Sequence, residues 1–336
     1  MSFIHTLCSV LSSVGMGAAC CLFVTACASL PPQSPGTPPP AGLTGWVPLA
    51  DVARRVQSPA AGWRVSVEGA TLKTPSHTIR LVSGSRCMEI DGALVWLNAA
   101  PVAHPAGSAN LYLSPADVRD LEALHTPVDK RLPQTPRRRY LTVMLDPGHG
   151  GEDRGAVSAG ASQEEKELTL DLARRVAAGL ARAPVHVMFT RDDDSGLPLD
   201  LRVTRAANAK ADCLVSIHAN AAPNRNATGV ETYLVPAAGF PSTSGGTAEA
   251  VVPGNAFADA NFALAFSVHS QLAKLGRPDR GIKRARYHVL RNAPCPAILV
   301  EVGFLSNAGE ARWLGTNSHR QRLADAISAG IRAYAD

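Results

Sequence analysis

The chain has 336 residues, with 33 Lys and Arg against 28 Asp and Glu, which gives a formal charge of +5. No residue of these four types stands before Asp51. An apolar content of 46% excludes a wholly disordered chain, and the lack of an apolar run of about 20 residues after position 50 excludes a polytopic membrane protein. The modest positive charge permits an anionic wall polymer or a membrane surface as partner and does not predict nucleic-acid binding.

The uncharged start of the chain predicts export. Residues 7–26 are apolar, and Val24-Thr25-Ala26-Cys27 resembles a bacterial lipobox, in which the cysteine is the lipidated first residue of the mature protein. We therefore expect a signal peptide at 1–26 and a Pro-rich linker at 27–44. A plain secretory signal and an uncleaved span are the alternatives, since a positively charged start is missing. Ala28 resembles an outer-membrane address, so the expected location is the periplasmic face of that membrane.

The cysteines outside the leader do not predict a disulfide framework. Cys87, Cys213 and Cys295 are an odd number and lie far apart. Cys213 and Cys295 fall within apolar runs, which predicts buried thiols.

Residues 45–126 form the first predicted folded unit, a small α+β module. We expect helices at 47–56 and 114–124, and strands at 63–67, 78–81, 87–90 and 94–97. The pattern resembles the amino-terminal module of copper amine oxidases. His77 and His104 are interpreted as isolated loop residues, because single histidines without partners are poor metal sites. A basic linker at 127–139 follows, whose three arginines at 137–139 could contact anionic lipid or wall polymer.

From Tyr140 onward, apolar runs of strand length alternate with helical patterns. We expect strands at 141–145, 185–190, 213–217, 230–235, 287–290 and 297–302, and helices at 164–180, 199–209, 257–275 and 319–334. This alternation predicts an α/β domain over 140–336, in which a mixed, mostly parallel sheet is flanked by helices.

Four islands of polar residues stand at or near predicted strand or helix ends. They are DPGHGG at 146–151, EEKE at 164–167, SIHAN at 216–220 and LVEVGFLSN at 299–307. The carboxyl edge of an α/β sheet is where such proteins bind ligands. Each island also has a structural interpretation: a turn histidine, a helix start that complements the helix dipole, or a buried Glu301 paired with an arginine.

Taken together, the islands indicate hydrolytic metal chemistry. Two histidines and one glutamate are a known catalytic zinc set that leaves a fourth position for water. A separate carboxylate can then act as general base. Glu301 lies between two valines, where an ionised carboxylate without a partner or a metal costs several kcal/mol.

The ordered motifs DPGHGGEDRGA, EKELTLDLA, TRDDD, ADCLVSIHAN, GVETYLV and AILVEVGFLSN resemble those of the zinc-dependent N-acetylmuramoyl-L-alanine amidases. The resemblance spans about Tyr140 to Tyr334. It implies that His149, Glu165 and His218 bind Zn²⁺ and that Glu301 is catalytic. Glu165 is chosen over Glu164 and Glu167 because the family's ligand directly precedes a lysine.

Three further residues fall within these motifs. Arg191 and Arg202 are interpreted as anchors of loops and of the core edge, and Asn220 as a tentative substrate contact.

The resemblance also implies the reaction and its setting. The expected activity is hydrolysis of the amide bond between N-acetylmuramic acid and L-Ala in peptidoglycan, with the membrane as a second partner through the lipid anchor. A catalytically inactive wall-binding lipoprotein and a zinc peptidase acting on stem peptides are the alternatives. Some relatives carry an inhibitory helix and need a protein activator. Residues 236–256 are rich in Gly, Pro and Ser, which predicts a flexible rim loop in place of that helix.

Overall fold

The computed structural model describes residues 43–59, 62–126, 140–158 and 162–335. The predicted signal peptide, Cys27, most of the Pro-rich linker and the basic linker at 127–139 lie outside these ranges. In the described part of the chain, no helix combines the length and the apolar character that a membrane crossing requires.

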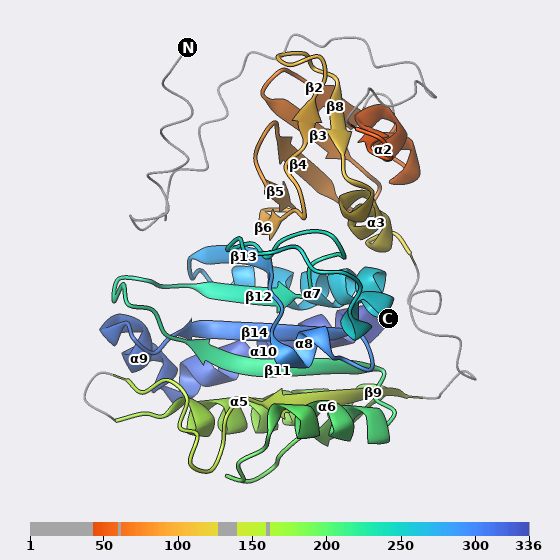
Figure 1. The fold of residues 1–336 in the computed structure, drawn as a ribbon. Coiled ribbons are helices and arrows are strands. Elements are labelled where there is room, and N and C mark those ends of the chain that lie inside the picture. The colour runs from red at the N-terminus through yellow and green to blue at the C-terminus, as the bar shows by residue number, and fades with distance from the viewer. Residues whose placement is uncertain (1–42, 60–61, 127–139, 159–161, 336) are drawn as a thin grey trace.

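The carboxyl-terminal unit, which we define as the described residues from 140 to 335, is an α/β fold. Its strands are β9 (Leu141–Pro147), β10 (Val185–Phe189), β11 (Cys213–Asn220), β12 (Val230–Leu234), β13 (Asp279–Arg284) and β14 (Ala297–Phe304). They are ordered β10-β9-β11-β14-β12-β13, and only β12 and β14 pair antiparallel. The prediction of a mixed, mostly parallel sheet is confirmed (Figure 1).

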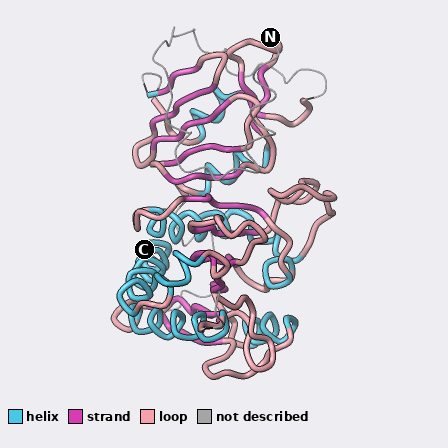
Figure 2. Tube along the Cα trace, turned by 90° about the vertical axis from the view of Figure 1, so that its left-hand side faces the viewer, coloured by secondary structure: helices cyan, strands magenta, loops and turns pink. Residues whose placement is uncertain are grey.

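Helices lie on both faces of this sheet. They are α5 (Glu165–Leu180), α6 (Leu199–Asn208), η2 (Pro253–Phe257), α7 (Ala258–Ala273), α8 (His288–Arg291), α9 (Ala308–Leu314) and α10 (Asn317–Ala335). Helices α5, α7 and α10 cover one face, where side chains such as Val215 and Val300 are fully buried. We call this the covered face and the opposite one the outer face. A smaller core under α6 and α8 occupies part of the outer face. Helices thus lie on both sides of the strands (Figure 2).

The amino-terminal module, defined as the described residues from 43 to 126, extends the same sheet. Its elements are β1 (Val47–Pro48), α2 (Leu49–Arg55), β2 (Trp63–Val65), β3 (Gly69–Lys73), β4 (Thr78–Val82), β5 (Cys87–Ile90), β6 (Ala93–Trp96), β7 (Val102–Ala103), β8 (Leu111–Leu113) and α3 (Pro115–Ala123). Strands β2 to β6 form an antiparallel meander, and β6 pairs with β13 in parallel, with Val95 opposite Ile282. The result is one 11-stranded sheet, β10-β9-β11-β14-β12-β13-β6-β5-β4-β3-β2.

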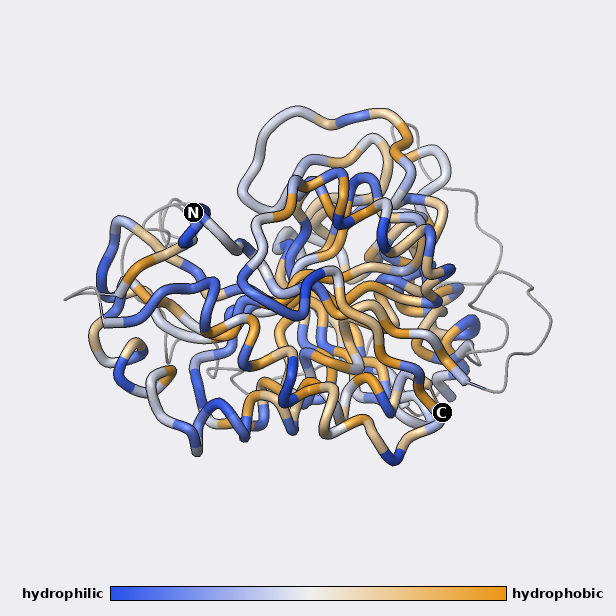
Figure 3. Tube along the Cα trace, turned by 90° about the horizontal axis from the view of Figure 1, so that it is seen from below, coloured by the Kyte–Doolittle hydropathy of each residue, from blue (hydrophilic) through white to orange (hydrophobic). Residues whose placement is uncertain are grey.

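The two units share buried contacts as well as the sheet. A three-stranded sheet, β1-β8-β7, belongs to the module, and its residue Leu113 joins the same apolar cluster as α7. Viewed from below, hydrophobic segments gather at the centre of the molecule (Figure 3). Arg284 of β13 donates from Nη2 to Asp120 Oδ2 of α3 at 2.6 Å, and both side chains are buried. Charged groups join the units here because each has a partner across the boundary.

Several details of the prediction differ from the structure, and three of them concern the site and its surroundings. Residues 287–290 were predicted as a strand, and this is wrong: Tyr287 is the N-cap of the short helix α8, and residues 288–290 begin it. Four residues are too few to show the period that distinguishes a helix from a strand. Strand β13 was missed, since DRGIKR holds one large apolar residue. His77 is not isolated, because its Nδ1 lies 2.6 Å from Asp91 Oδ2.

Other expectations hold. The predicted rim loop at 236–256 contains no helix over 236–252, whereas its last four residues belong to the 3-10 helix η2. Cys213 and Cys295 are buried free thiols, as predicted.

Candidate metal centre

The loop after β9 presents His149 in an uncommon backbone conformation. Its φ is 62°, in the left-handed region that non-glycine residues seldom adopt. Two buried arginines hold this loop. Arg191 donates to the carbonyl oxygens of Pro147 (3.0 Å) and Gly148 (2.8 Å), and Arg202 donates to that of His149 (2.6 Å). The prediction that Arg191 and Arg202 are anchors is confirmed, and their effect is to fix the direction of the His149 side chain.

Glu165 is the first residue of α5 and is 4% exposed. Its Oε1 accepts from the backbone N–H of Ala219 at 3.0 Å and its Oε2 from that of Ala156 at 2.8 Å. Its neighbours in the acidic run point elsewhere: Glu164 accepts from Arg154 at 2.6 Å, and Glu167 is exposed. Among the acidic residues of this run, Glu165 is therefore the one that the helix start brings to the histidines.

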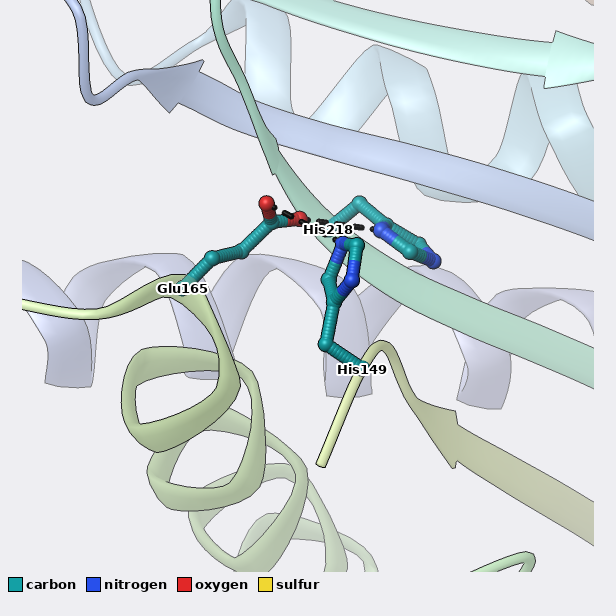
Figure 4. Close-up of side chains that lie close together, drawn as sticks. All are labelled: His149, Glu165 and His218. Atoms are coloured by element: carbon teal, nitrogen blue, oxygen red, sulfur yellow. Dashed lines mark hydrogen bonds and ion pairs between the residues drawn. The ribbon is translucent and has the colours of Figure 1, made fainter. Parts of the chain in front are cut away.

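His149, Glu165 and His218 converge from three separate elements (Figure 4). His218 Nδ1 lies 2.9 Å from Glu165 Oε1, and His149 Nε2 lies 3.1 Å from Glu165 Oε2. One ligand atom from each residue lies within 4.8 Å of the others. Glycine at 148 is required by this packing, since a Cβ there would fall 2.2 Å from the His218 ring.

The electrostatics of the three residues are strongly coupled. Burial alone would raise the pKa of Glu165, but hydrogen bonds and charge from His149 and His218 outweigh it and lower that pKa far below its usual value. Burial likewise opposes a charged His149, yet the carboxylates of Glu165 and Asp153 raise its pKa. The carboxylate of Glu165 is therefore ionised, and its negative charge favours a cation between the side chains.

Asp153 is a member of the site that the sequence interpretation did not single out. Its Oδ2 lies 2.8 Å from His149 Nδ1, which leaves Nε2 free to face Glu165. A carboxylate on the far nitrogen of a histidine ligand fixes the ring and makes it more basic. The available signal was the four-residue spacing from His149 to Asp153 inside the glycine-rich loop.

Glu301 stands beside this cluster on the outer face. On neighbouring strands it pairs in register with His218 of β11 and with Glu231 of β12, so the three side chains form a row with a spacing of about 5 Å. Glu301 is 8% exposed, and its Oε2 has no hydrogen-bond partner among the described residues. Burial, with the charges of Glu165 and Glu231, raises its pKa well above the usual value.

The row continues into a polar network that the sequence interpretation also left out. Glu231 is 1% exposed and accepts from Tyr233, Arg280 and Lys283. Its position inside an apolar strand was the same signal that singled out Glu301. Asn220 lies at the end of β11 with Nδ2 3.5 Å from Glu231 Oε2, so it approaches this network. Its role as a substrate contact stays a prediction.

The donor set fits a metal ion. Two imidazoles and one carboxylate match the ligand types of hydrolytic zinc sites. The unpartnered Glu301 Oε2 fits as well, since it can receive a water hydrogen beside such an ion. A hollow of about 450 Å³ opens next to His149 and is lined by the loop residues 150–153, Gly196 and Leu197, with Arg202.

The family model of N-acetylmuramoyl-L-alanine amidases matches residues 143–333, more than half of the chain, and the chain belongs to this family. Among curated relatives, amidase AmiC of Neisseria meningitidis is 35% identical over 253 residues, which cover 68% of this chain and 60% of the relative. AmiC of Escherichia coli is 33% identical, and the match covers 59% of this chain and 54% of the relative. The chain thus spans between half and two thirds of these relatives.

Solved structures agree with this assignment. An N-acetylmuramoyl-L-alanine amidase from Clostridium difficile 630 superposes with a TM-score of 0.52 at 34% identity, covering 59% of this chain and 98% of its own. AmiC2 of Nostoc punctiforme superposes with a TM-score of 0.50 at 33% identity, and the match covers 58% of this chain and 97% of its own. Somewhat less than 60% of this chain thus covers nearly the full length of both solved structures.

Proposed function

We propose that the chain is a zinc-dependent peptidoglycan amidase that hydrolyses the bond between the lactyl carbonyl of N-acetylmuramic acid and the nitrogen of L-Ala. The observation that carries this proposal is the convergence of His149, Glu165 and His218 next to the buried carboxyl of Glu301. Zn²⁺ held by those three residues would act as a Lewis acid on the amide carbonyl and lower the pKa of a nearby water to about 7.

The protein's own groups account for the proton transfers. Glu301 accepts a proton from the attacking water and delivers it to the leaving nitrogen of L-Ala, so that a carboxylic acid and an amine result. Its raised pKa suits both steps, because the carboxyl holds the proton between them. Asp153 orients His149, and Arg202 and Arg191 hold the loop that carries it.

The test is digestion of purified peptidoglycan followed by mass spectrometry. The wild-type chain is expected to release stem peptides with L-Ala at the amino terminus and to leave the glycan strands intact. Glu301→Gln should keep its zinc, measured by elemental analysis, and lose about 10²–10⁴-fold in rate, the usual range for a general base. Cleavage within the stem peptide would indicate a peptidase, and binding without cleavage an inactive wall-binding protein.

We further propose that Cys27 is lipidated and anchors the chain at the periplasmic face of the outer membrane. The lipobox-like residues 24–27 and the Pro-rich spacer after them support this proposal. Metabolic labelling with an acyl-chain probe tests it, and a Cys27→Ala chain that still incorporates the label would contradict it.

A further inference from the structure

The outer face of the sheet continues from the candidate site onto the amino-terminal module. The row that begins with His218, Glu301 and Glu231 reaches β13, where Arg280 and Lys283 contact Glu231. Because Val95 of β6 pairs with Ile282, the next residue of each strand, Trp96 and Lys283, share the outer face. Trp96 also donates from its indole Nε1 to the carbonyl oxygen of Arg280 at 3.3 Å.

Close packing joins the two units at this point. A Cβ on Gly281 would lie 3.1 Å from Cδ1 of Trp96, so the glycine lets the indole approach the backbone of β13. The half-buried indole therefore bridges the module and the strand that carries the cations of the Glu231 network.

Beyond β6 the outer face is open. Apart from the buried Gly69, the residues of β2 to β5 on this face are exposed or half-buried, whereas residues on the opposite face, such as Leu72 and Ile79, are fully buried. On this face Arg64 pairs in register with Thr71, Thr71 with Arg80, and Arg80 with Glu89. Lys73 lies on the same side of β3 and is exposed.

We propose that this face, from β13 across β6 to β2, binds the stretch of the peptidoglycan strand that lies to one side of the bond that the site cleaves. The proposal rests on the proposed function, because it names how the same substrate extends beyond the site. We call the face the strand-binding face.

Charge supports an anionic polymer as the occupant. The strand-binding face carries five cations, Arg64, Lys73, Arg80, Arg280 and Lys283, against two carboxylates, Glu89 and Glu231. Stem peptides of peptidoglycan carry free carboxylates, and the apolar faces of its sugars can pack on an indole such as that of Trp96.

Distance supports the same occupant. Four strand spacings separate β11, which carries His218, from β6, which carries Trp96. At about 4.8 Å per spacing this is roughly 19 Å, and β3 lies about 34 Å from β11. A single muramyl peptide cannot contact both ends of such a face, whereas a polymer can.

The test compares a double charge reversal on the face with a matched one elsewhere. Arg64→Glu with Lys73→Glu changes two exposed cations of β2 and β3. Arg182→Glu with Arg322→Glu makes the same change in net charge at exposed positions after α5 and on α10, helices of the covered face. Each full-length protein is sedimented with insoluble sacculi, and kcat/KM is measured on sacculi and on a soluble disaccharide-tetrapeptide.

The face variant should bind sacculi at least tenfold more weakly than the control variant. Its ratio of kcat/KM on sacculi to kcat/KM on the soluble substrate should fall by a similar factor, with an unchanged melting temperature. Trp96→Ala should lower the same ratio and Trp96→Phe should restore it. Equal binding and equal ratios in the two charge variants would overturn the proposal.

Two further outcomes separate the alternatives. Wild-type protein that sediments with anionic lipid vesicles and not with sacculi would make the face a membrane contact, which overturns the proposal. Wild-type protein that releases no stem peptides from either substrate would refute the proposed function. Sedimentation of the variants would then still decide whether the strand-binding face holds the polymer.

Discussion

Single side chains decide the geometry of the candidate site through contacts that lie one layer behind it. His149 occupies a left-handed conformation that its own side chain does not favour, and the loop keeps it there because buried arginines satisfy its carbonyls. Asp153 then selects the ring nitrogen that faces Glu165. The chemistry proposed for the site thus depends on residues that do not themselves bind the metal.

Asp153→Asn is expected to weaken zinc binding by about 10–100-fold, the usual cost of losing a carboxylate behind a histidine ligand. The amide keeps the size of the side chain but lacks the charge that favours a basic His149. Competition with a chromogenic chelator measures the affinity. Asp192→Asn, an exposed change in a neighbouring loop, is the control, and equal affinities for the two variants would contradict the assignment.

Arg202→Met is expected to destabilise the fold by about 3–5 kcal/mol, the cost of leaving a buried charge without its partner. Arg202 Nη1 lies 2.7 Å from Asp146 Oδ1, and both side chains are almost fully buried. Urea unfolding measures the change, with the exposed Arg174→Met as control. Although burial opposes it, Arg202 and the hydrogen bonds to Asp146 lower the pKa of this aspartate. The stabilisation by the ion pair of Arg202 and Asp146 is therefore present above about pH 4 and is lost as the pH falls further. A loss similar to that of the control would refute this account.

At the scale of elements, the register between strands and the start of a helix bring the site residues together. His218, Glu301 and Glu231 come together because β11, β14 and β12 are neighbours in register, although 83 residues separate the first two along the chain. Helix α5 contributes its first residue, Glu165, to the same place. In the module, helix α3 contributes Asp120 and Asp117 to a buried polar cluster with Asn98 and Arg284.

The α3 cluster predicts a pH-dependent stability. Burial raises the pKa of Asp120 to about 7, with Asp117 adding to the effect and Arg284 opposing it. Between about pH 4 and about pH 7 the folded state holds a proton that the unfolded state has released. The free energy of unfolding should therefore fall with rising pH, by up to about 1.4 kcal/mol per pH unit over this interval.

Asp120→Asn removes the titrating group and should remove this slope. Urea unfolding at several pH values measures it, with the exposed Asp325→Asn as control. Parallel curves for wild type and Asp120→Asn across the interval would show that Asp120 is ionised throughout.

At the scale of the whole molecule, an 11-stranded sheet runs through both units in the described part of the chain, and the module covers the β13 edge of the carboxyl-terminal unit. The family model matches residues 143–333, so the module lies outside the matched part. Its strand β6 covers the edge of β13, and its Asp120 accepts a hydrogen bond from the buried Arg284. These contacts make the module a structural part of the carboxyl-terminal unit.

The full chain is accordingly expected to unfold in a single thermal transition in differential scanning calorimetry. A chain lacking residues 1–126 should melt at a lower temperature, because β13 becomes an exposed edge and Arg284 loses its partner. In the shortened chain, replacing the unpartnered arginine by an apolar residue, Arg284→Met, should recover part of the lost melting temperature. Two separate transitions in the full chain would show that the units are independent.

Periodicity and motif order could be read from the chain because they depend on local chemistry. The alternation of apolar strands and amphipathic helices from Leu141 to Tyr334 predicted the α/β fold, and the spacing of the glycines placed His149 at a strand end. Glu301 could be singled out because a charge between two valines is costly unless the fold provides a use for it.

Tertiary structure decided whatever depends on partners far away in the sequence. Strand β13 has a polar sequence, because its charged residues have hydrogen-bond partners on α3, α7 and β12. Short helices such as α8 show no hydrophobic period in the sequence. The choice of Glu165 within an acidic run came from family resemblance, whereas its contacts came from packing. The amino acid sequence by itself determined the class of fold and the chemistry at the strand ends. Only the tertiary structure decided that the module continues the same sheet, because strand pairing between distant segments leaves no local pattern.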